Sequence, residues 1–242
     1  MLGKFEDLII RPPRNVPKPE ALGPLSSDGW EREEFRLKNG QGRELFGTLL
    51  RPRSKDEVST PCLVYAHANA SNRTRALEFR DVLCADMGVA LVTFDFLSCG
   101  ESDPRFGPDG DFISLGFHEA DDLCLVLDFV VSRFGRVVLL GRSMGSAAVL
   151  VYAARYAGKH PSVVGLIFDG VFESLRHLIK DVAKQSSLLG LIAPLGVPII
   201  RRSILQKAKF DLDDLNLVEM AKSVKIPALF LVAKEDELFP RV

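Results

Sequence analysis

Short apolar runs recur along the chain and alternate with stretches of helical pattern. Four runs, at residues 62–66, 89–94, 137–140 and 163–168, are apolar at nearly every position, and a fifth lies at 228–232. Strands of this kind are typical of a parallel sheet that is covered on both faces. The intervals 74–87, 118–132 and 144–157 have apolar residues at helical spacing. The alternation predicts an α/β fold with a mostly parallel, doubly wound sheet.

The N-terminal part has a different pattern. Residues 1–28 are rich in proline, arginine and glycine, which predicts an extended arm ahead of one domain at 29–242. Two strand-like runs, 30–37 and 44–50, flank Asn39-Gly40, a dipeptide typical of hairpin turns. We therefore expect an antiparallel hairpin to precede the parallel sheet.

The last two apolar runs are separated by about sixty residues, far more than one crossover helix needs. The apolar stretch at 188–200 contains two prolines and is too short to span a membrane. This interval predicts a helical cap at about 172–215. Because the chain stops at Val242, we expect the last strand and helix of the fold to be absent. We also expect a bare apolar edge at 228–232, as in a truncated copy of a longer protein.

The segment Gly141-Arg142-Ser143-Met144-Gly145 matches the pattern G-x-S-x-G. It follows a predicted strand directly and precedes a predicted helix, as a nucleophile elbow requires. We expect Ser143 in an unfavourable backbone conformation with its side chain exposed at the carboxyl edge of the sheet. The start of the following helix adds free N–H groups where an oxyanion would form.

A polar loop at 67–73 follows the first parallel strand and is the second candidate element. In hydrolases of this architecture such a loop supplies one oxyanion N–H, and the residue after the nucleophile supplies the other. By position, the donors are the backbone N–H groups of Asn69 and Met144. We interpret His67 as a histidine that shapes the loop, in preference to a catalytic base.

The acidic run after the fifth apolar run supplies the candidate acid, Asp236, with Asp169 as the reserve and Glu235 less favoured. The order serine, acid, histidine fits this fold, but every histidine lies upstream of Asp236. We expect His118 in a solvated helical turn with Glu119, Asp121 and Asp122, and His160 on the far side of the elbow helix. His177 is the only upstream substitute for the base.

The charge balance, the chain start and the cysteines each argue against a class of protein. Lys plus Arg is 31 and Asp plus Glu is 32, a balance that argues against general nucleic-acid binding. The chain start lacks an apolar signal core, and the cysteines form no CxxC pair and no metal-ligand spacing. We therefore expect a cytoplasmic protein without metal or cofactor. The scattered cysteines are Cys62, Cys84, Cys99 and Cys124.

Several segments resemble one group of enzymes, the serine aminopeptidase-like α/β-hydrolases. Within that group the chain is most similar to an intracellular branch of protein depalmitoylases with many protist relatives. The similar segments are residues 9–14, 67–69, 94–102, 113–116 with Glu119 and Asp122, 141–145, 153–155, 210–216 and the Asp236 region. The resemblance runs nearly from end to end and implies an α/β-hydrolase fold. Ala68, Ser98 and Ala233 stand where these enzymes usually have glycine, and their histidine has no counterpart here.

Three functions remain open from the sequence. The first is a hydrolase of carboxylic esters or thioesters, acting on a small molecule or an acylated protein, with an acyl-enzyme on Ser143. The second is an aminopeptidase with a cap carboxylate for the substrate amine, for which Glu173, Asp181 and Glu219 are candidates. The third is a binding protein that has the fold without the base. The apolar cap run followed by Arg201, Arg202, Lys207 and Lys209 suggests peripheral membrane contact.

Overall fold

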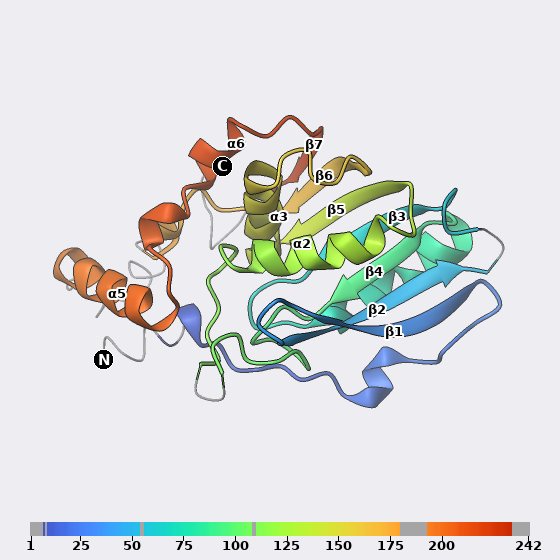
Figure 1. Cartoon of the computed structure of the whole chain (residues 1–242), viewed down its shortest axis with the longest axis horizontal. Coiled ribbons are helices and arrows are strands. Elements are labelled where there is room, and N and C mark those ends of the chain that lie inside the picture. Colours follow the sequence, from blue (N-terminus) through green and yellow to red (C-terminus); the bar gives the residue numbers. More distant parts are fainter. Residues whose placement is uncertain (1–6, 8, 54–55, 108–109, 180–192, 234–242) are drawn as a thin grey trace.

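Seven strands form one mixed sheet in the order β1-β2-β4-β3-β5-β6-β7 (Figure 1). The computed structural model describes residues 7, 9–53, 56–107, 110–179 and 193–233. The hairpin β1 (Trp30–Lys38) and β2 (Glu44–Pro52) pairs antiparallel, and β2 pairs antiparallel with β4 (Ala90–Phe94). All other pairs are parallel, through β3 (Pro61–Ala66), β5 (Arg136–Arg142), β6 (Val163–Asp169) and β7 (Ala228–Leu231). The predicted fold class and hairpin are confirmed.

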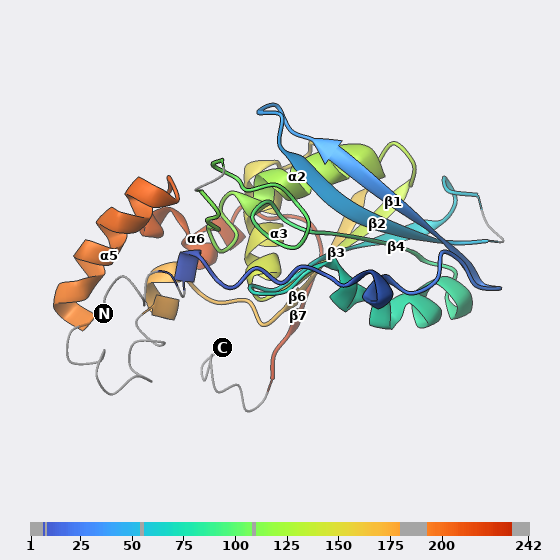
Figure 2. The same ribbon diagram turned by 90° about the horizontal axis from the view of Figure 1, so that it is seen from below.

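Helices cover both faces of the sheet. The α-helices α2 (Glu119–Val130) and α3 (Met144–Arg155) lie on one face, and η2 (Arg73–Phe79) and η3 (Asp81–Asp86) lie on the other (Figure 2). The predicted helical stretch over 74–87 is present, as a 3-10 helix followed by a π-helix and not as one α-helix. With three residues per turn, Arg73 and Ala76 lie above one another on the buried side.

The main core lies between the sheet and α2 and α3. Helix α3 is buried from Met144 to Ala153, as expected for a helix that is apolar on every side. A smaller cluster packs on the opposite face, where Trp30 and Tyr65 meet Leu77 and Cys84 beneath η2 and η3. The helix that follows Ser143 is therefore fixed along most of its length.

The segment between β6 and β7 contains α5 (Ala193–Lys207), η4 (Leu212–Asp214) and α6 (Leu217–Ala221). Helix α5 lies away from the sheet in Figure 1, with Ile200 and Ile204 buried and Ile199 and Leu205 exposed. This segment overlaps the predicted cap, of which residues 180–192 lie outside the described part. Among the described helices, none combines the length and apolar character that crossing a membrane requires.

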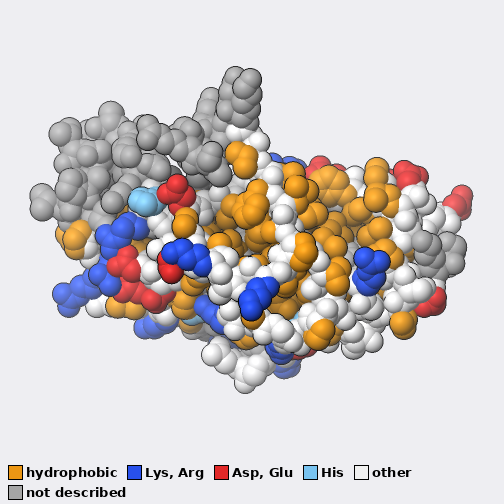
Figure 3. Space-filling view, turned by 90° about the horizontal axis from the view of Figure 1, so that it is seen from above, with side chains coloured by type: hydrophobic (Ala, Val, Ile, Leu, Met, Phe, Trp, Pro, Cys, Tyr) orange, Lys and Arg blue, Asp and Glu red, His pale blue; other side chains and the backbone are white. Residues whose placement is uncertain are grey.

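Strand β7 borders the sheet on the side of β6. Its side chains Leu229, Phe230 and Leu231, and the following Val232, are 44–54% exposed. Figure 3 shows this side of the molecule, where hydrophobic side chains gather on the surface. The bare apolar edge expected from the sequence is thus present in the described part of the chain.

The N-terminal arm lies against the domain. Ile9 and Ile10 are buried in the main core, and the backbone N–H of Ile113 donates to the carbonyl of Ile10 at 2.9 Å. After a largely extended stretch the arm forms the short turn η1 (Pro19–Leu22). Residues 9 and 10 of the predicted arm are therefore part of the packed structure.

Candidate functional site

Ser143 lies at the turn between β5 and α3, with φ 50° and ψ −112°. A residue with a side chain rarely adopts this backbone conformation. It does so only where the surrounding structure holds it there. The predicted unfavourable conformation is confirmed, and the side chain is half-buried. Because β5 is parallel to its neighbours, the turn lies at the carboxyl edge of the sheet.

Neighbouring backbone leaves no room for a side chain at the two glycines of the elbow. A Cβ atom on Gly141 would lie 2.3 Å from the carbonyl oxygen of Gly145. A Cβ atom on Gly145 would lie 2.0 Å from the carbonyl oxygen of Ala66, at the end of β3. The start of α3 thus packs directly against the backbone that leads into the 67–73 loop, which brings the two predicted elements together.

Backbone hydrogen bonds fix the elbow to β6. The N–H of Ser143 donates to the carbonyl of Asp169 at 2.8 Å. The hydroxyl of Ser146 donates to the carbonyl of Gly141 at 2.6 Å and accepts from the N–H of Asp169 at 3.1 Å. Ser146 is fully buried, and the sequence reasoning missed this positioning role because a serine in an apolar helix gives no distinct signal.

The 67–73 loop begins with a fully buried histidine. His67 Nδ1 lies 2.8 Å from the carbonyl of Ala68, and its Nε2 accepts from the N–H of Phe96 at 3.3 Å. Burial lowers the pKa of His67, which favours the neutral ring that these two contacts need. Both ring nitrogens are occupied by backbone groups, so the interpretation of His67 as a loop-shaping residue agrees with the structure.

The proposed oxyanion donors stay a prediction. The first helical hydrogen bond of α3 runs from Ala147 N–H to the carbonyl of Ser143 at 3.1 Å, so the N–H of Met144 precedes the helical pattern. Asn69 is half-buried, and its side-chain oxygen accepts from the N–H of Ala70 at 2.7 Å. Ala70 itself has φ 52°, a left-handed conformation next to the proposed donor.

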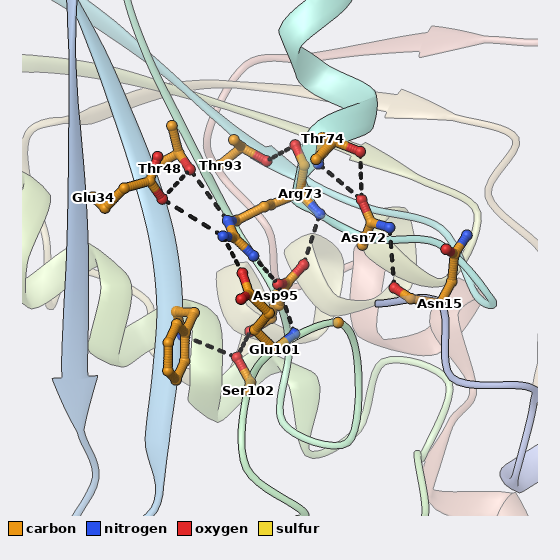
Figure 4. Close-up of polar contacts among 12 residues, drawn as sticks. Asn15, Glu34, Thr48, Asn72, Arg73, Thr74, Thr93, Asp95, Glu101 and Ser102 are labelled. Atoms are coloured by element: carbon orange, nitrogen blue, oxygen red, sulfur yellow. Dashed lines mark hydrogen bonds and ion pairs between the residues drawn. The ribbon is translucent and has the colours of Figure 1, made fainter. Parts of the chain in front are cut away.

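A buried charge network encloses the end of this loop (Figure 4). Arg73 is 2% exposed and Asp95 is fully buried, and the two form an ion pair. Arg73 also pairs with Glu101. The sequence reasoning did not single out Arg73, because an arginine among Asn, Ser and Thr gives the pattern of a solvated loop.

The family follows from the sequence match. The model of the alpha/beta hydrolase family matches residues 63–239. The chain belongs to the alpha/beta hydrolase family. It is 24% identical to protein bem46 of Schizosaccharomyces pombe, across 99% of this chain and 72% of that protein.

Solved α/β-hydrolase structures share the fold. An esterase of Pyrococcus furiosus has a TM-score of 0.63 and 18% identity, covering 93% of this chain and 78% of its own. Acetyl xylan esterase 1 of Thermoanaerobacterium sp. has a TM-score of 0.64 and 17% identity, covering 98% and 78%. Proline iminopeptidase of Mycobacterium smegmatis has a TM-score of 0.55 and 14% identity, covering 86% and 84%.

The acid of this alpha/beta hydrolase stays a prediction. Asp236 lies outside the described residues, as do Glu235 and Asp181. The carboxylate of Asp169, the reserve, lies 3.4 Å from the guanidinium Nε of Arg142, and its backbone holds the elbow. Asp169 is therefore already used as a structural residue beside Ser143.

His118 and His177 have partners of their own, away from Ser143. His118 Nε2 lies 3.0 Å from the carbonyl of Ala208, and burial lowers the pKa of His118. His177 is exposed, with Nδ1 3.1 Å from a carboxylate oxygen of Glu173. Among the described residues no contact joins either histidine to Ser143.

The predicted solvated turn around His118 is wrong for two of its three acids. Glu119 is fully buried and Asp122 is 3% exposed. The guanidinium Nη2 of Arg105 lies 2.6 Å from Asp122 and 3.5 Å from Glu119. This buried pairing compensates the carboxylates, whereas Asp121 stays exposed as expected.

One group of side chains in the described part could hold a metal ion. The ligand atoms of Cys124, Asp128 and His160 lie within 4.8 Å of one another, beyond the far end of α3 from Ser143. Lys159 Nζ lies 3.1 Å from Cys124 Sγ and 3.0 Å from Asp128 Oδ2. A lysine cation therefore already neutralises this group. That the chain works without a metal stays a prediction.

Proposed function

We propose that this chain is a serine hydrolase that cleaves carboxylic esters or thioesters through an acyl-enzyme on Ser143. The observation that carries the proposal is the backbone of Ser143, with φ 50° at the strand-to-helix turn between two sterically required glycines. Such stored strain is typical of a nucleophile elbow. The esterase descriptions of two structural neighbours agree with this reaction class.

In the proposed reaction the Ser143 oxygen attacks the carbonyl carbon of the substrate and loses its proton to a base. The oxyanion accepts hydrogen bonds from the N–H groups of Asn69 and Met144. The C–O or C–S bond then breaks, the leaving group takes up the proton, and water hydrolyses the acyl-enzyme. Asp236 orients the base.

The base in this proposal is a histidine, as in the triad of this fold. Residues 1–242 contain no histidine after Asp236. We therefore expect 1–242 alone to be less active by roughly three to six orders of magnitude, the range seen when a triad member is lost.

The aminopeptidase function has less support. Of the candidate cap carboxylates, Glu173 pairs with His177 at 3.1 Å and Glu219 pairs with Lys222 at 2.5 Å. Both pairs are exposed, so neither carboxylate is held ready for a substrate amine. We propose ester or thioester substrates, as a small molecule or an acylated protein, in preference to peptides.

The proposed compartment is the cytoplasm. The four cysteines are free and buried, which agrees with a reducing environment. We also propose peripheral membrane contact through α5, whose exposed side chains include Ile199, Leu205 and Arg202.

Covalent labelling tests the nucleophile. A fluorophosphonate probe should modify the protein read to its natural stop codon, with the added mass on the peptide that contains Ser143. Ser143→Ala should remove the label, and the surface variant Ser132→Ala should keep it. A label that survives Ser143→Ala, or lies on another peptide, would exclude Ser143 as nucleophile.

The same probe tests the base. We expect the longer chain to react and to hydrolyse a thioester, and 1–242 to do neither. Equal labelling of both chains, abolished by His177→Ala, would assign the base to His177. Absence of label and turnover in the longer chain would favour the non-catalytic binding function.

A further inference from the structure

The proposed oxyanion loop contains a conformation that needs support. Ala70 has φ 52°, which is unfavourable for a residue with a Cβ by about 1 kcal/mol or more. Ala70 is exposed, so its own side chain makes little packing contribution. The conformation must be held by the residues on either side of it.

The end of the loop is attached to the N-terminal arm. Asn72 caps η2, with its side-chain oxygen accepting from the N–H of Thr74 at 2.9 Å. Its side-chain amide donates to the carbonyl of Asn15 at 3.0 Å, as Figure 4 shows. One buried side chain thus connects the arm to the last residues of the loop.

Arg73, the next residue, attaches the loop to the segment after β4. Its backbone N–H donates to one oxygen of Asp95 at 2.7 Å, and its guanidinium meets the other oxygen of the same carboxylate. The second guanidinium nitrogen reaches Glu101, and Nε donates to the hydroxyl of Thr48 at 3.2 Å. A guanidinium with this many partners has one orientation, which fixes the backbone that carries it.

Arg14 forms hydrogen bonds with the segment that contains Glu101. Its Nε donates to the carbonyl of Gly100 at 2.8 Å, and Nη2 donates to the carbonyl of Ser102. A weaker contact of 3.5 Å reaches Asp111. Consecutive arm residues, Arg14 and Asn15, therefore hold the two segments that the Arg73 ion pairs join.

We propose that Arg14 and Asn15 of the arm, together with Arg73, form a brace that positions the oxyanion loop at 67–72. These are positioning residues, since none of them donates to the oxyanion in the proposed reaction. The inference rests on the proposed function. It gives a role to Arg14 and Asn15 of the arm, which the catalytic proposal leaves without one.

The brace makes a kinetic prediction. Oxyanion donors act on charge that develops in the transition state, so a displaced loop lowers kcat and changes KM little. Removing one donor outright lowers kcat roughly 10²–10³-fold. Loosening the loop should cost less, about tenfold, because the donor is displaced and not deleted.

The arm supplies its own matched pair of variants. Arg14→Gln removes the contacts to the carbonyls of Gly100 and Ser102. Arg11→Gln removes a nearby arginine of the arm, whose guanidinium lies over the ring of Phe112. Both side chains reach the surface, so both variants should fold. Arg14→Lys keeps the charge without the fork and should restore part of the loss. Glu101→Gln weakens the brace from the other side.

The experiment combines hydrogen exchange with ester kinetics on the protein read to its natural stop codon. For Arg14→Gln and Glu101→Gln we expect faster amide exchange in residues 67–73 and a fall of about tenfold in kcat at similar KM. Arg11→Gln should match the wild type in both measurements.

Each alternative outcome has a distinct meaning. Unchanged exchange in Arg14→Gln would overturn the brace, and faster exchange at unchanged kcat would overturn its positioning role. A wild type that neither labels at Ser143 nor hydrolyses ester would instead overturn the proposed function, and the role of the brace in catalysis with it. Labelling at Ser143 with Arg14→Gln equal to Arg11→Gln would overturn the brace alone.

Discussion

The elbow and the 67–73 loop meet at the carboxyl edge of the sheet, and each contains one residue with a side chain at positive φ. Ser143 has φ 50° and Ala70 has φ 52°. The elbow is held by the absence of side chains at Gly141 and Gly145 and by close backbone contacts. The loop is held by buried charges and by the arm. The glycines that the elbow requires lie within five consecutive residues, whereas the charged partners that hold the loop lie far apart in the sequence.

The largest expected effect concerns the loop. Arg73→Met leaves the carboxylate of Asp95 buried without its partner, and breaking a buried ion pair in this way costs roughly 3–5 kcal/mol. The ion pair next to the elbow, between Arg142 and Asp169, is 49% and 41% exposed, so Arg142→Met should change stability by less than about 0.5 kcal/mol. Urea unfolding of the two variants measures the contrast. Equal losses would remove the distinction between the two segments.

The next effect concerns the elbow. Gly145→Ala places a methyl group 2.0 Å from the carbonyl oxygen of Ala66, and we expect a loss of about 3 kcal/mol from overpacking against backbone. Gly165 on β6 is the matched control, since its added methyl would lie 3.6 Å from the nearest side-chain atom of Val138. A thermal shift assay should show a much lower Tm for Gly145→Ala only. A stable Gly145→Ala would mean that α3 can move away from β3.

The difference between the two segments also explains what the sequence could predict. The elbow, the hairpin and the apolar strands are local patterns, and each was predicted with its residues. Arg73 was missed because its carboxylate partner Asp95 is 22 residues away. The turn at His118 was predicted as solvated because Arg105, which neutralises Asp122, lies 17 residues upstream. Charged residues show their burial only when the fold brings their partners together.

The third prediction uses the strain at Ser143. Glycine adopts positive φ without a steric penalty, so Ser143→Gly should raise the free energy of unfolding by about 1–2 kcal/mol while removing the probe label. Ser143→Ala keeps the Cβ and should remove the label without that gain. Chemical denaturation of both variants separates strain from chemistry. Equal stability of the two would show that the elbow stores little strain.

The smallest effect concerns the pH dependence that His67 gives to the loop. Burial lowers the pKa of His67 in the folded protein, whereas in the unfolded chain it returns to about 6.5. At a pH between these two pKa values, the unfolded chain therefore binds a proton that the folded protein does not bind. As pH falls through about 6.5, the free energy of unfolding decreases until the folded pKa is reached.

His67→Gln removes the titratable ring, while the glutamine amide can still form hydrogen bonds with backbone groups. We expect the variant to be less stable at pH 7.5 but to lose less stability than the wild type between pH 7.5 and pH 5.5, by at most about 1.4 kcal/mol, the limit for one proton over one pH unit. Phe96→Leu is the control, because it weakens the ring contact to His67, at 4.9 Å between centroids, without removing a titratable group. Phe96→Leu should lower the stability by the same amount at both pH values. A wild-type slope retained in His67→Gln would assign the acid sensitivity to another group, for which His118, whose pKa is also lowered by burial, is the first to test.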